Sequence, residues 1–277
     1  MGKPITRSGS GSTPSASIPF PARKIRKITT KPPIAPITTV TAQTLNPQLD
    51  QALAHLRESD PLLAPLISAH PPPTFFPPPP LLSPPFLSLT RAILYQQLAT
   101  SAANSIYARF LSLCGGTVLP PTVLSLSPAQ LRAIGVSGRK SGYIRDLAER
   151  FESGSLTDEG ILRMGSDEEM MAGLTAVKGI GVWTVHMFMM FNLGRGDVLP
   201  VGDLGVRKGV MRLYGLKGLP NEAEMERVCE KWRPYRSVGA WYMWRLVEQS
   251  NKAFELKKEI VGRSGDESTE VANETLQ

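Results

Sequence analysis

Residues 174–185, LTAVKGIGVWTV, place two glycines, Gly179 and Gly181, between two stretches that carry apolar residues at helical spacing. The periodic residues are Met170, Leu174 and Val177 before the glycines and Trp183, Met187, Met190 and Phe191 after them. A dinucleotide-binding loop needs a preceding strand and a third glycine, whereas this chain has a helical pattern first and Thr184 at the third position. The segment therefore predicts a tight turn that joins two helices.

Helical periodicity continues through most of the chain after residue 45. The longest segment, residues 85–116, is expected to form one helix that includes Gln97. Convincing strand patterns are absent, apart from a weak one at residues 117–126. The sequence predicts an all-α protein of about ten helices, in which the halves on either side of residues 114–127 could pack as two lobes with a cleft between them.

Basic charge is concentrated near the N-terminus. Seven of the 31 Lys and Arg residues, and none of the 24 Asp and Glu residues, lie before residue 50, so the 24 remaining basic residues balance the acids. A basic segment rich in Ser, Pro and Thr buries too little apolar surface to offset its ordering entropy, which predicts a disordered tail over residues 1–45. A helical domain is expected over residues 46–255, with a Pro-rich loop at 70–85 and a flexible tail at 256–277.

The tail carries the cluster ARKIRK, residues 22–27, which fits a nuclear-import signal, a nonspecific phosphate contact or a solvated segment. We expect a nuclear protein, and an organellar transit peptide stays open because the tail is Ser-rich and free of acids. No run of eighteen apolar residues occurs, so we expect a soluble, intracellular protein without a membrane partner. Cys114 and Cys229 are far apart and indicate neither a disulfide framework nor a metal cluster.

The predicted turn has the chemistry of an anion site. The first N–H groups of a helix lack partners within that helix, and the positive end of the helix dipole adds to them, so Gly179, Gly181 and Thr184 lie where backbone groups can bind phosphate. Lys178 stands immediately before the turn, and DNA phosphate is the obvious ligand. The alternative is that the glycines form only a tight connection.

A second basic pair, Arg139 and Lys140, stands at a Gly-rich helix start in VSGRKSGY. Phosphate contacts and solvated charges are both open for these two side chains. Asp203, in VGDLGVRKGV, occupies a predicted N-cap position. Capping alone stabilises a helix by about 1 kcal/mol, and the same location favours an ionised carboxylate that can oppose developing positive charge.

These motifs carry a resemblance to a known family. The run LTAVKGIGVWTVHMFMMFNLGRGDVLPVGDLGVRKG, the segment WRPYRSVGAWYMWR and the helix ILYQQLATSAANSIYARF resemble the helix-hairpin-helix DNA glycosylase superfamily, in its alkylated-base branch, the DNA-3-methyladenine glycosylase II group. The resemblance extends from about residue 50 to about residue 250. It implies a two-lobed helical DNA glycosylase fold with a helix-hairpin-helix motif and a cleft, and a monomer that acts on double-stranded DNA containing damaged bases.

The implied reaction is hydrolysis of the N-glycosidic bond of a damaged nucleotide rotated out of the duplex. Departure of the base gives the deoxyribose oxocarbenium character, which the Asp203 carboxylate would stabilise by ~3–4 kcal/mol, as comparable preorganised contacts do. Members with lyase activity carry a nucleophilic Lys two residues beyond the last glycine of the turn, where this chain has Trp183. The resemblance therefore implies a monofunctional glycosylase that uses water.

The resemblance also implies a base pocket and a wedge. Trp183, Trp244 and Tyr95 are candidates for the aromatic wall that would hold a cationic alkylated purine, with core packing as the alternative for Trp183. Gln97 falls where relatives push a side chain into the gap left by the extruded base, and the alternative is a buried helical glutamine. No metal or other cofactor is expected, because an iron–sulfur cluster would need four closely spaced cysteines.

Two other functions stay open at this point. A noncatalytic helix-hairpin-helix DNA-binding protein would retain the turn and lose the chemistry, although capping alone would accept Ser or Asn in place of Asp203. A bifunctional glycosylase/lyase for oxidised bases would need an amine nucleophile from elsewhere in the chain.

Overall fold

The computed structural model describes residues 46–76 and 83–249. The chain divides into two units, Met1–Thr44 and Leu45–Gln277, and every described residue belongs to the second. The predicted tails at 1–45 and 256–277 and the middle of the Pro-rich loop lie outside the described residues, so these predictions stay open. Within the described part, no helix combines the length and the apolar character that a membrane span requires.

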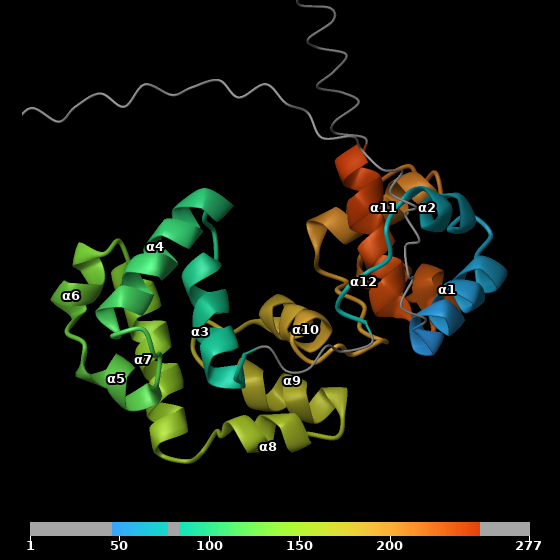
Figure 1. Cartoon of the computed structure of the whole chain (residues 1–277). Coiled ribbons are helices and arrows are strands. Elements are labelled where there is room, and N and C mark those ends of the chain that lie inside the picture. The colour runs from blue at the N-terminus through green and yellow to red at the C-terminus, as the bar shows by residue number, and fades with distance from the viewer. Residues whose placement is uncertain (1–45, 77–82, 250–277) are drawn as a thin grey trace, which may run out of the picture. The chain divides into compact units, whose positions relative to one another are not determined.

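The described residues form helices and contain no strand, as the sequence predicted (Figure 1). The labelled elements are α1 (Pro47–Ser59), α2 (Ala64–Ala69), α3 (Pro85–Tyr95), α4 (Thr100–Leu113), α5 (Pro120–Ser125), α6 (Pro128–Ala133), α7 (Gly138–Glu152), α8 (Asp158–Arg163), α9 (Asp167–Thr175), α10 (Val182–Phe191), α11 (Leu204–Leu213), α12 (Glu222–Cys229) and the 3₁₀-helix η1 (Glu230–Trp232). A further helix, at residues 236–249, follows η1 and carries no label.

The helices pack in two sets. In the first set, α4 and α8 pack on α3, α5 and α6 pack on α7, and α7 packs on α3. In the second set, α1 packs on α2 and on η1, which also contacts α12. The predicted division at residues 114–127 is therefore wrong, because α5 lies inside that range and packs within the first set. The N-terminal helices instead join the C-terminal ones, and α10 contacts both α3 and α9.

Helix starts follow the capping residues that the sequence offers. Ser127 caps α6 in a reciprocal capping box with Gln130, and Pro128 occupies the first turn, as predicted. Side-chain oxygens also accept from a backbone N–H at the start of further helices, at Asn46, Ser137, Thr157, Ser166, Asp203 and Asn221. The predicted N-cap position of Asp203 is confirmed.

The long helix expected at residues 85–116 is broken, and this prediction is wrong. Gln96 leaves the helical region with φ −50° and ψ 133°, and Gln97 has φ 56°, in the left-handed region. The Lys140 Nζ donates to the carbonyls of Leu94 and Gln96, at 2.7 Å each, and so satisfies groups that a continuous helix would bond internally. Gln97 is consequently exposed in a turn, and the alternative of a buried helical glutamine is also wrong.

Within residues 46–76 and 83–249, one acidic residue is buried in the core. Asp60 is fully buried and accepts hydrogen bonds from the Tyr214 hydroxyl, from the Trp232 indole at 2.8 Å and from the Leu62 N–H at 3.3 Å. The Lys231 ammonium lies 3.2 Å from the same carboxylate. Burial and the hydrogen bond to Asp60 raise the pKa of Tyr214. The carboxylate, at the end of α1, thus links that helix to η1 and to the end of α11.

We expect Asp60→Ala to lower the free energy of unfolding by about 3 to 5 kcal/mol, because it leaves buried donors and an ammonium without their partner. Urea denaturation measures this loss. The control is Glu159→Gln, which removes an ion pair with Arg163 whose side chains are 79% and 80% exposed. This control should cost about 0.5 kcal/mol or less. Equal losses in the two variants would contradict the role of Asp60.

Candidate active site

The turn between α9 and α10 is built around Gly179. This residue has φ +83°, and a Cβ on it would lie 2.2 Å from the Cδ2 atom of Tyr143, so a side chain fits neither the backbone nor the space. Gly181 is the N-cap of α10 and offers no side-chain cap. The N–H groups of Val182, Trp183 and Thr184 therefore begin the helix without partners inside it. The turn therefore has the backbone geometry on which the predicted anion site depends, and phosphate binding there stays a prediction.

The turn borders a cavity of about 790 Å³. Its walls come from the turn itself, from the start of α7 and from the segment between α3 and α4, with Gln96, Gln97, Ser137, Arg139, Lys140, Tyr143 and residues 175–181 as the lining. The side chain of Gln96 ties two of these walls together by donating to the Gly179 carbonyl at 2.8 Å. The sequence-predicted phosphate contacts Lys178, Gly179, Gly181, Arg139 and Lys140 are thereby brought to one cavity.

Lys178 is held beside this cavity by Asp146. The carboxylate accepts from the Lys178 N–H at 3.1 Å and lies 3.1 Å from the Lys178 ammonium, while Arg150 donates to it at 3.1 Å. Burial opposes ionisation of Asp146, but the hydrogen bonds from Lys178 and Arg150 hold the pKa of the carboxyl below its usual value. The Lys178 side chain remains 74% exposed, so its ammonium is still accessible to a phosphate.

The other predicted phosphate contacts differ from one another. Arg139 is exposed, whereas Lys140 uses its ammonium inside the protein on the two carbonyls at the end of α3. Burial lowers the pKa of Lys140. Thr184 is only 5% exposed, so its backbone N–H rather than its hydroxyl is suited to a phosphate contact. The structure thus gives Lys140 a role that the sequence did not predict, in holding the turn that carries Gln97, and its phosphate contact stays a prediction.

Asp203 stands at the centre of the candidate active site. Its Oδ1 accepts from the Val206 N–H at 2.8 Å and from the indole N–H of Trp244 at 2.9 Å. Its Oδ2 accepts from the indole N–H of Trp183 at 2.7 Å. These donors come from α11, from the helix at 236–249 and from α10, so three helices fix one partly exposed carboxylate. Trp183 and Trp244, both predicted as pocket residues, meet at this acid.

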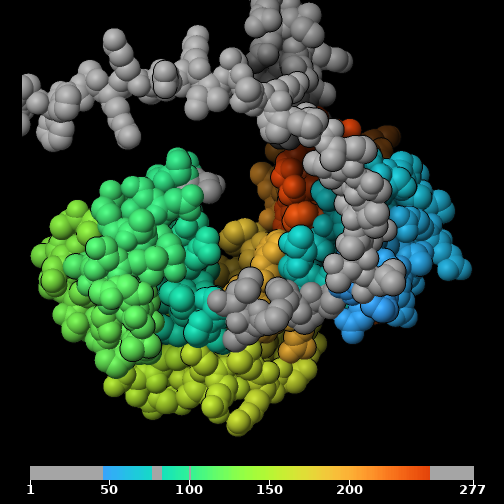
Figure 2. Space-filling view, in the orientation of Figure 1, coloured from blue at the N-terminus to red at the C-terminus, as the bar shows by residue number. Residues whose placement is uncertain are grey.

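A second cavity, of about 510 Å³, adjoins Trp183. Its lining is Ala92, Tyr95, Gln96, Gln97, Leu98, Trp183, Thr184 and Met187, and so it shares the two glutamines with the first cavity. Trp183 is 48% exposed although it lies in an apolar helix, which indicates a wall of this space rather than core packing. Figure 2 shows the surface hollowed between the part that contains α3 and the part that follows α10.

Sequence reasoning missed several neighbours of the pocket. The Arg91 guanidinium lies over the Tyr95 ring, 5.0 Å from its centroid, and the Tyr95 hydroxyl donates to Asn104 at 2.6 Å. The four-residue spacing of Arg91 and Tyr95 on one helix could have signalled this pair. Phe191 packs against Trp244 with ring centroids 5.9 Å apart, a contact that joins distant segments and leaves no local signal. Among the described residues, no group of His, Cys, Asp and Glu side chains is placed to hold a metal ion.

The site thus combines a helix start without a side-chain cap, at α10, with a carboxylate that accepts from two indoles. The chain matches the model of the HhH-GPD superfamily base excision DNA repair proteins over residues 90–234. It is 36% identical over 163 residues to DNA-3-methyladenine glycosylase 1 of Schizosaccharomyces pombe, covering 58% of this chain and 72% of the relative. The chain therefore belongs to the HhH-GPD superfamily of base excision DNA repair proteins.

Two solved structures agree with this assignment. The S. pombe 3-methyladenine DNA glycosylase in complex with abasic DNA matches with a TM-score of 0.62 and 34% identity, covering 70% of this chain and 95% of that one. A DNA-3-methyladenine glycosidase from Bacillus halodurans matches with a TM-score of 0.63 and 35% identity, covering 76% and 93%. The predicted fold class and the resemblance are confirmed.

Replacing each glycine of the turn by alanine should lower the free energy of unfolding by a different amount. Gly179→Ala should lower the free energy of unfolding by at least about 1 to 2 kcal/mol, because alanine disfavours positive φ and its Cβ would meet Tyr143. Gly181→Ala is the matched control, because its Cβ would meet nothing within 4 Å, and it should cost about 0.5 kcal/mol. Urea denaturation of both variants measures the difference. Equal costs would show that the turn does not depend on the left-handed residue.

The neighbouring cations Arg139 and Lys140 provide a second matched pair. Arg139→Gln should weaken binding to every duplex alike and reduce the slope of log affinity against log salt by about 1, with stability unchanged. Lys140→Met should also lower stability, by about 1 kcal/mol, because two carbonyls lose their donor. Duplex titrations at several salt concentrations and thermal unfolding separate the two effects. A lesion-specific change in the Arg139 variant would contradict its phosphate role.

Proposed function

We propose that this protein is a monofunctional DNA glycosylase that hydrolyses the N-glycosidic bond of alkylated purines, of the 3-methyladenine and 7-methylguanine type, in base excision repair. The observation that carries the proposal is the Asp203 carboxylate, which is held by the indoles of Trp244 and of Trp183, a residue that also lines the second cavity. The names of the relatives, which are DNA-3-methyladenine glycosylases, support the same substrate class.

Binding begins at the phosphates. The N–H groups that start α10 and the cations Lys178 and Arg139 bind the backbone near the damaged nucleotide, without reading its sequence. Extrusion of a base costs a few kcal/mol, and less for a damaged one. Gln97, exposed in the turn between α3 and α4 and lining both cavities, fills the gap in the stack and so shifts the balance toward the open duplex.

The aromatic cavity selects the base. Alkylation at a ring nitrogen makes a purine cationic, and the face of Trp183 attracts such a ring by ~0.5–2 kcal/mol. Tyr95 supplies a second wall, although Arg91 lies over its ring and the hydroxyl is bound to Asn104. Trp183 therefore carries most of the cation–π attraction, and Tyr95 contributes mainly shape.

The carboxylate acts on the sugar. As the glycosidic bond lengthens, positive charge develops on the deoxyribose, and the fixed negative charge of Asp203 stabilises it. A water molecule then adds to the sugar, and the same carboxylate can orient it. Trp183 stands where lyase members carry their nucleophilic Lys, so no Schiff base forms at that position. The reaction therefore ends with a free base and an abasic site.

We also propose that the protein acts as a monomer in the nucleus. Its substrate is double-stranded DNA, and the basic residues before residue 50 suit nuclear import or additional phosphate contacts. Fluorescence microscopy of the full chain and of a variant with ARKIRK neutralised tests the location. Unchanged nuclear accumulation of the variant would show that another segment directs import.

The proposed reaction is tested by incubating the full chain with methylated duplex DNA and separating the released bases by chromatography. We expect free methylated purines from the native protein and none from Asp203→Asn, which should still bind an abasic duplex. Borohydride added during the reaction should trap no covalent adduct. Release of oxidised bases together with a trapped adduct would instead identify a bifunctional glycosylase/lyase, and binding without any release would identify a noncatalytic DNA-binding protein.

A further inference from the structure

We propose that Asp197 and Arg236 form a positioning pair that sets the location of the Asp203 carboxylate, a role that rests on the proposed function of that acid. Asp197 lies in the linker between α10 and α11, six residues before Asp203. Arg236 begins the helix at 236–249, eight residues before Trp244. The linker thus carries Asp197 and leads to Asp203, and the helix carries Arg236 and Trp244, whose indole donates to Asp203.

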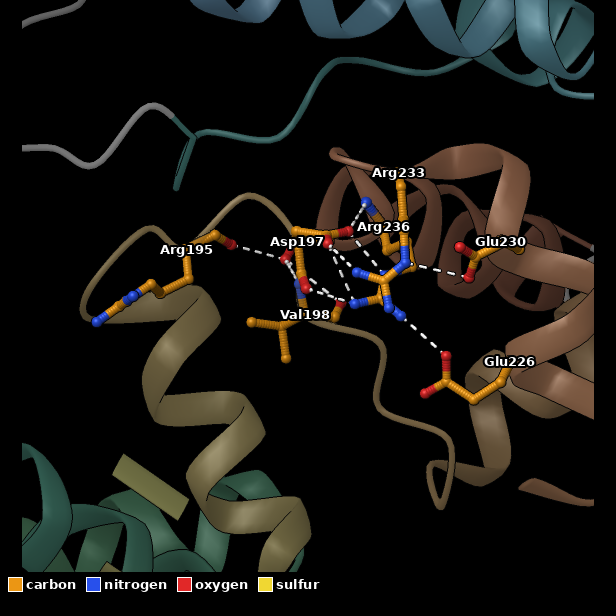
Figure 3. Close-up of polar contacts among 8 residues, drawn as sticks. Arg195, Asp197, Val198, Glu226, Glu230, Arg233 and Arg236 are labelled. Carbon is orange, nitrogen blue, oxygen red and sulfur yellow. Dashed lines mark hydrogen bonds and ion pairs between the residues drawn. The ribbon is translucent and has the colours of Figure 1, made fainter. Parts of the chain in front are cut away.

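The pair is a two-point contact, and the Asp197 Oδ2 also accepts from the Arg233 guanidinium at 2.7 Å. The Arg236 Nε donates to the Asp197 Oδ1 at 2.7 Å, and one terminal nitrogen donates to the Asp197 Oδ2 at 3.2 Å and to its carbonyl at 3.1 Å. The other terminal nitrogen donates to Glu226 of α12 at 2.9 Å. Figure 3 shows the guanidinium between these two acids. Because Arg236 is only 7% exposed, its planar group is held in one orientation.

Ser237 adds further hydrogen bonds between the linker and the last helix. The Ser237 N–H donates to the Gly196 carbonyl at 2.9 Å, and the Ser237 hydroxyl donates to the Arg195 carbonyl at 2.6 Å. The same hydroxyl accepts from the Val198 N–H at 2.9 Å. Ser237 is fully buried, so solvent does not compete for these hydrogen bonds. The linker is therefore attached to the last helix on both sides of Asp197.

A second contact between the linker and the last helix lies at the candidate active site. The Trp244 indole donates to the Asp203 Oδ1 at 2.9 Å. The linker from Asp197 to Asp203 and the helix from Arg236 to Trp244 are thus held together at both ends, by the Asp197–Arg236 contact and by the Asp203–Trp244 contact. Because the helix is rigid, a shift of Asp197 relative to Arg236 moves the linker and therefore the Asp203 carboxylate.

The linker is also attached to the side of the molecule that binds phosphate. Arg195 points away from Asp197 in Figure 3. Its guanidinium donates to the Met164 carbonyl at 2.8 Å and lies 3.3 Å from Asp167 at the start of α9. The helix α9 leads directly into the glycine turn. The positioning pair therefore fixes Asp203 relative to the helix that supplies Trp244. Arg195 holds the same linker to the start of α9, the helix that precedes the glycine turn.

A matched pair of variants tests the proposal, because Arg236 has two acidic partners and only one lies on the linker. Asp197→Asn removes the charge that faces Arg236 and Arg233, and Glu226→Gln removes the charge that faces Arg236 on the side of α12. Asp197→Asn should slow single-turnover release of methylated base between about 10- and 100-fold, since small misplacements of reacting groups have effects of this size. Its dissociation constant for an abasic duplex should change by less than about threefold.

Glu226→Gln should leave the rate of base release within about twofold of the native value, even where thermal stability falls. Asp197→Glu keeps the charge but lengthens the side chain by one methylene, and it should slow release in a folded protein. Hydrogen exchange gives a readout that needs no catalysis: the Val206 amide, which donates to Asp203, should lose protection in the Asp197 variants and keep it in Glu226→Gln.

Equal slowing by Asp197→Asn and Glu226→Gln, or an unchanged rate and unchanged Val206 protection in the Asp197 variants, would overturn the proposal. Failure of the proposed function looks different, because the native protein would then release no base. The exchange of the Val206 amide would in that case still decide whether Asp197 positions Asp203.

Discussion

The candidate active site depends on one carboxylate that receives three N–H donors from three helices. Asp203 caps α11 through the Val206 N–H and receives the indoles of Trp183 and Trp244. Hydrogen bonds to a charged group are stronger than those between neutral groups, and together they leave the carboxylate few orientations. Such a group is already oriented when positive charge develops beside it, and this preorganisation is the main source of electrostatic catalysis.

The fold brings the donors of this carboxylate together from distant parts of the chain. The Gly179 turn leads into α10, whose first residues lack a side-chain cap and whose Trp183 donates to the acid. The linker after α10 is fastened to the helix at 236–249 through Asp197 and Arg236, and that helix supplies Trp244. The candidate phosphate site and the candidate catalytic acid therefore share α10, because that helix begins at the turn and supplies Trp183.

Local rules predicted much of this arrangement, and tertiary contacts decided the rest. The capping role of Asp203 and the glycine turn follow from residue types and spacing, so both could be read from the sequence. The break after Tyr95 could not, because residues 85–116 keep helical periodicity throughout and the carbonyls at the break are satisfied by Lys140 from a distant helix. The indole contacts to Asp203 are equally nonlocal. Periodicity shows which face is apolar, but not which distant donor meets a given carbonyl or carboxylate.

The central claim is that Asp203 recognises a cationic sugar, and binding of a stable mimic tests it without the chemical step. Dissociation constants would be measured for two duplexes, one with a protonated pyrrolidine and one with a neutral tetrahydrofuran at the abasic position. The native protein should prefer the cationic duplex by about 100-fold or more, as expected for a transition-state mimic. The Asp203→Asn protein should bind the two nearly alike. An equal preference in both proteins would contradict the account.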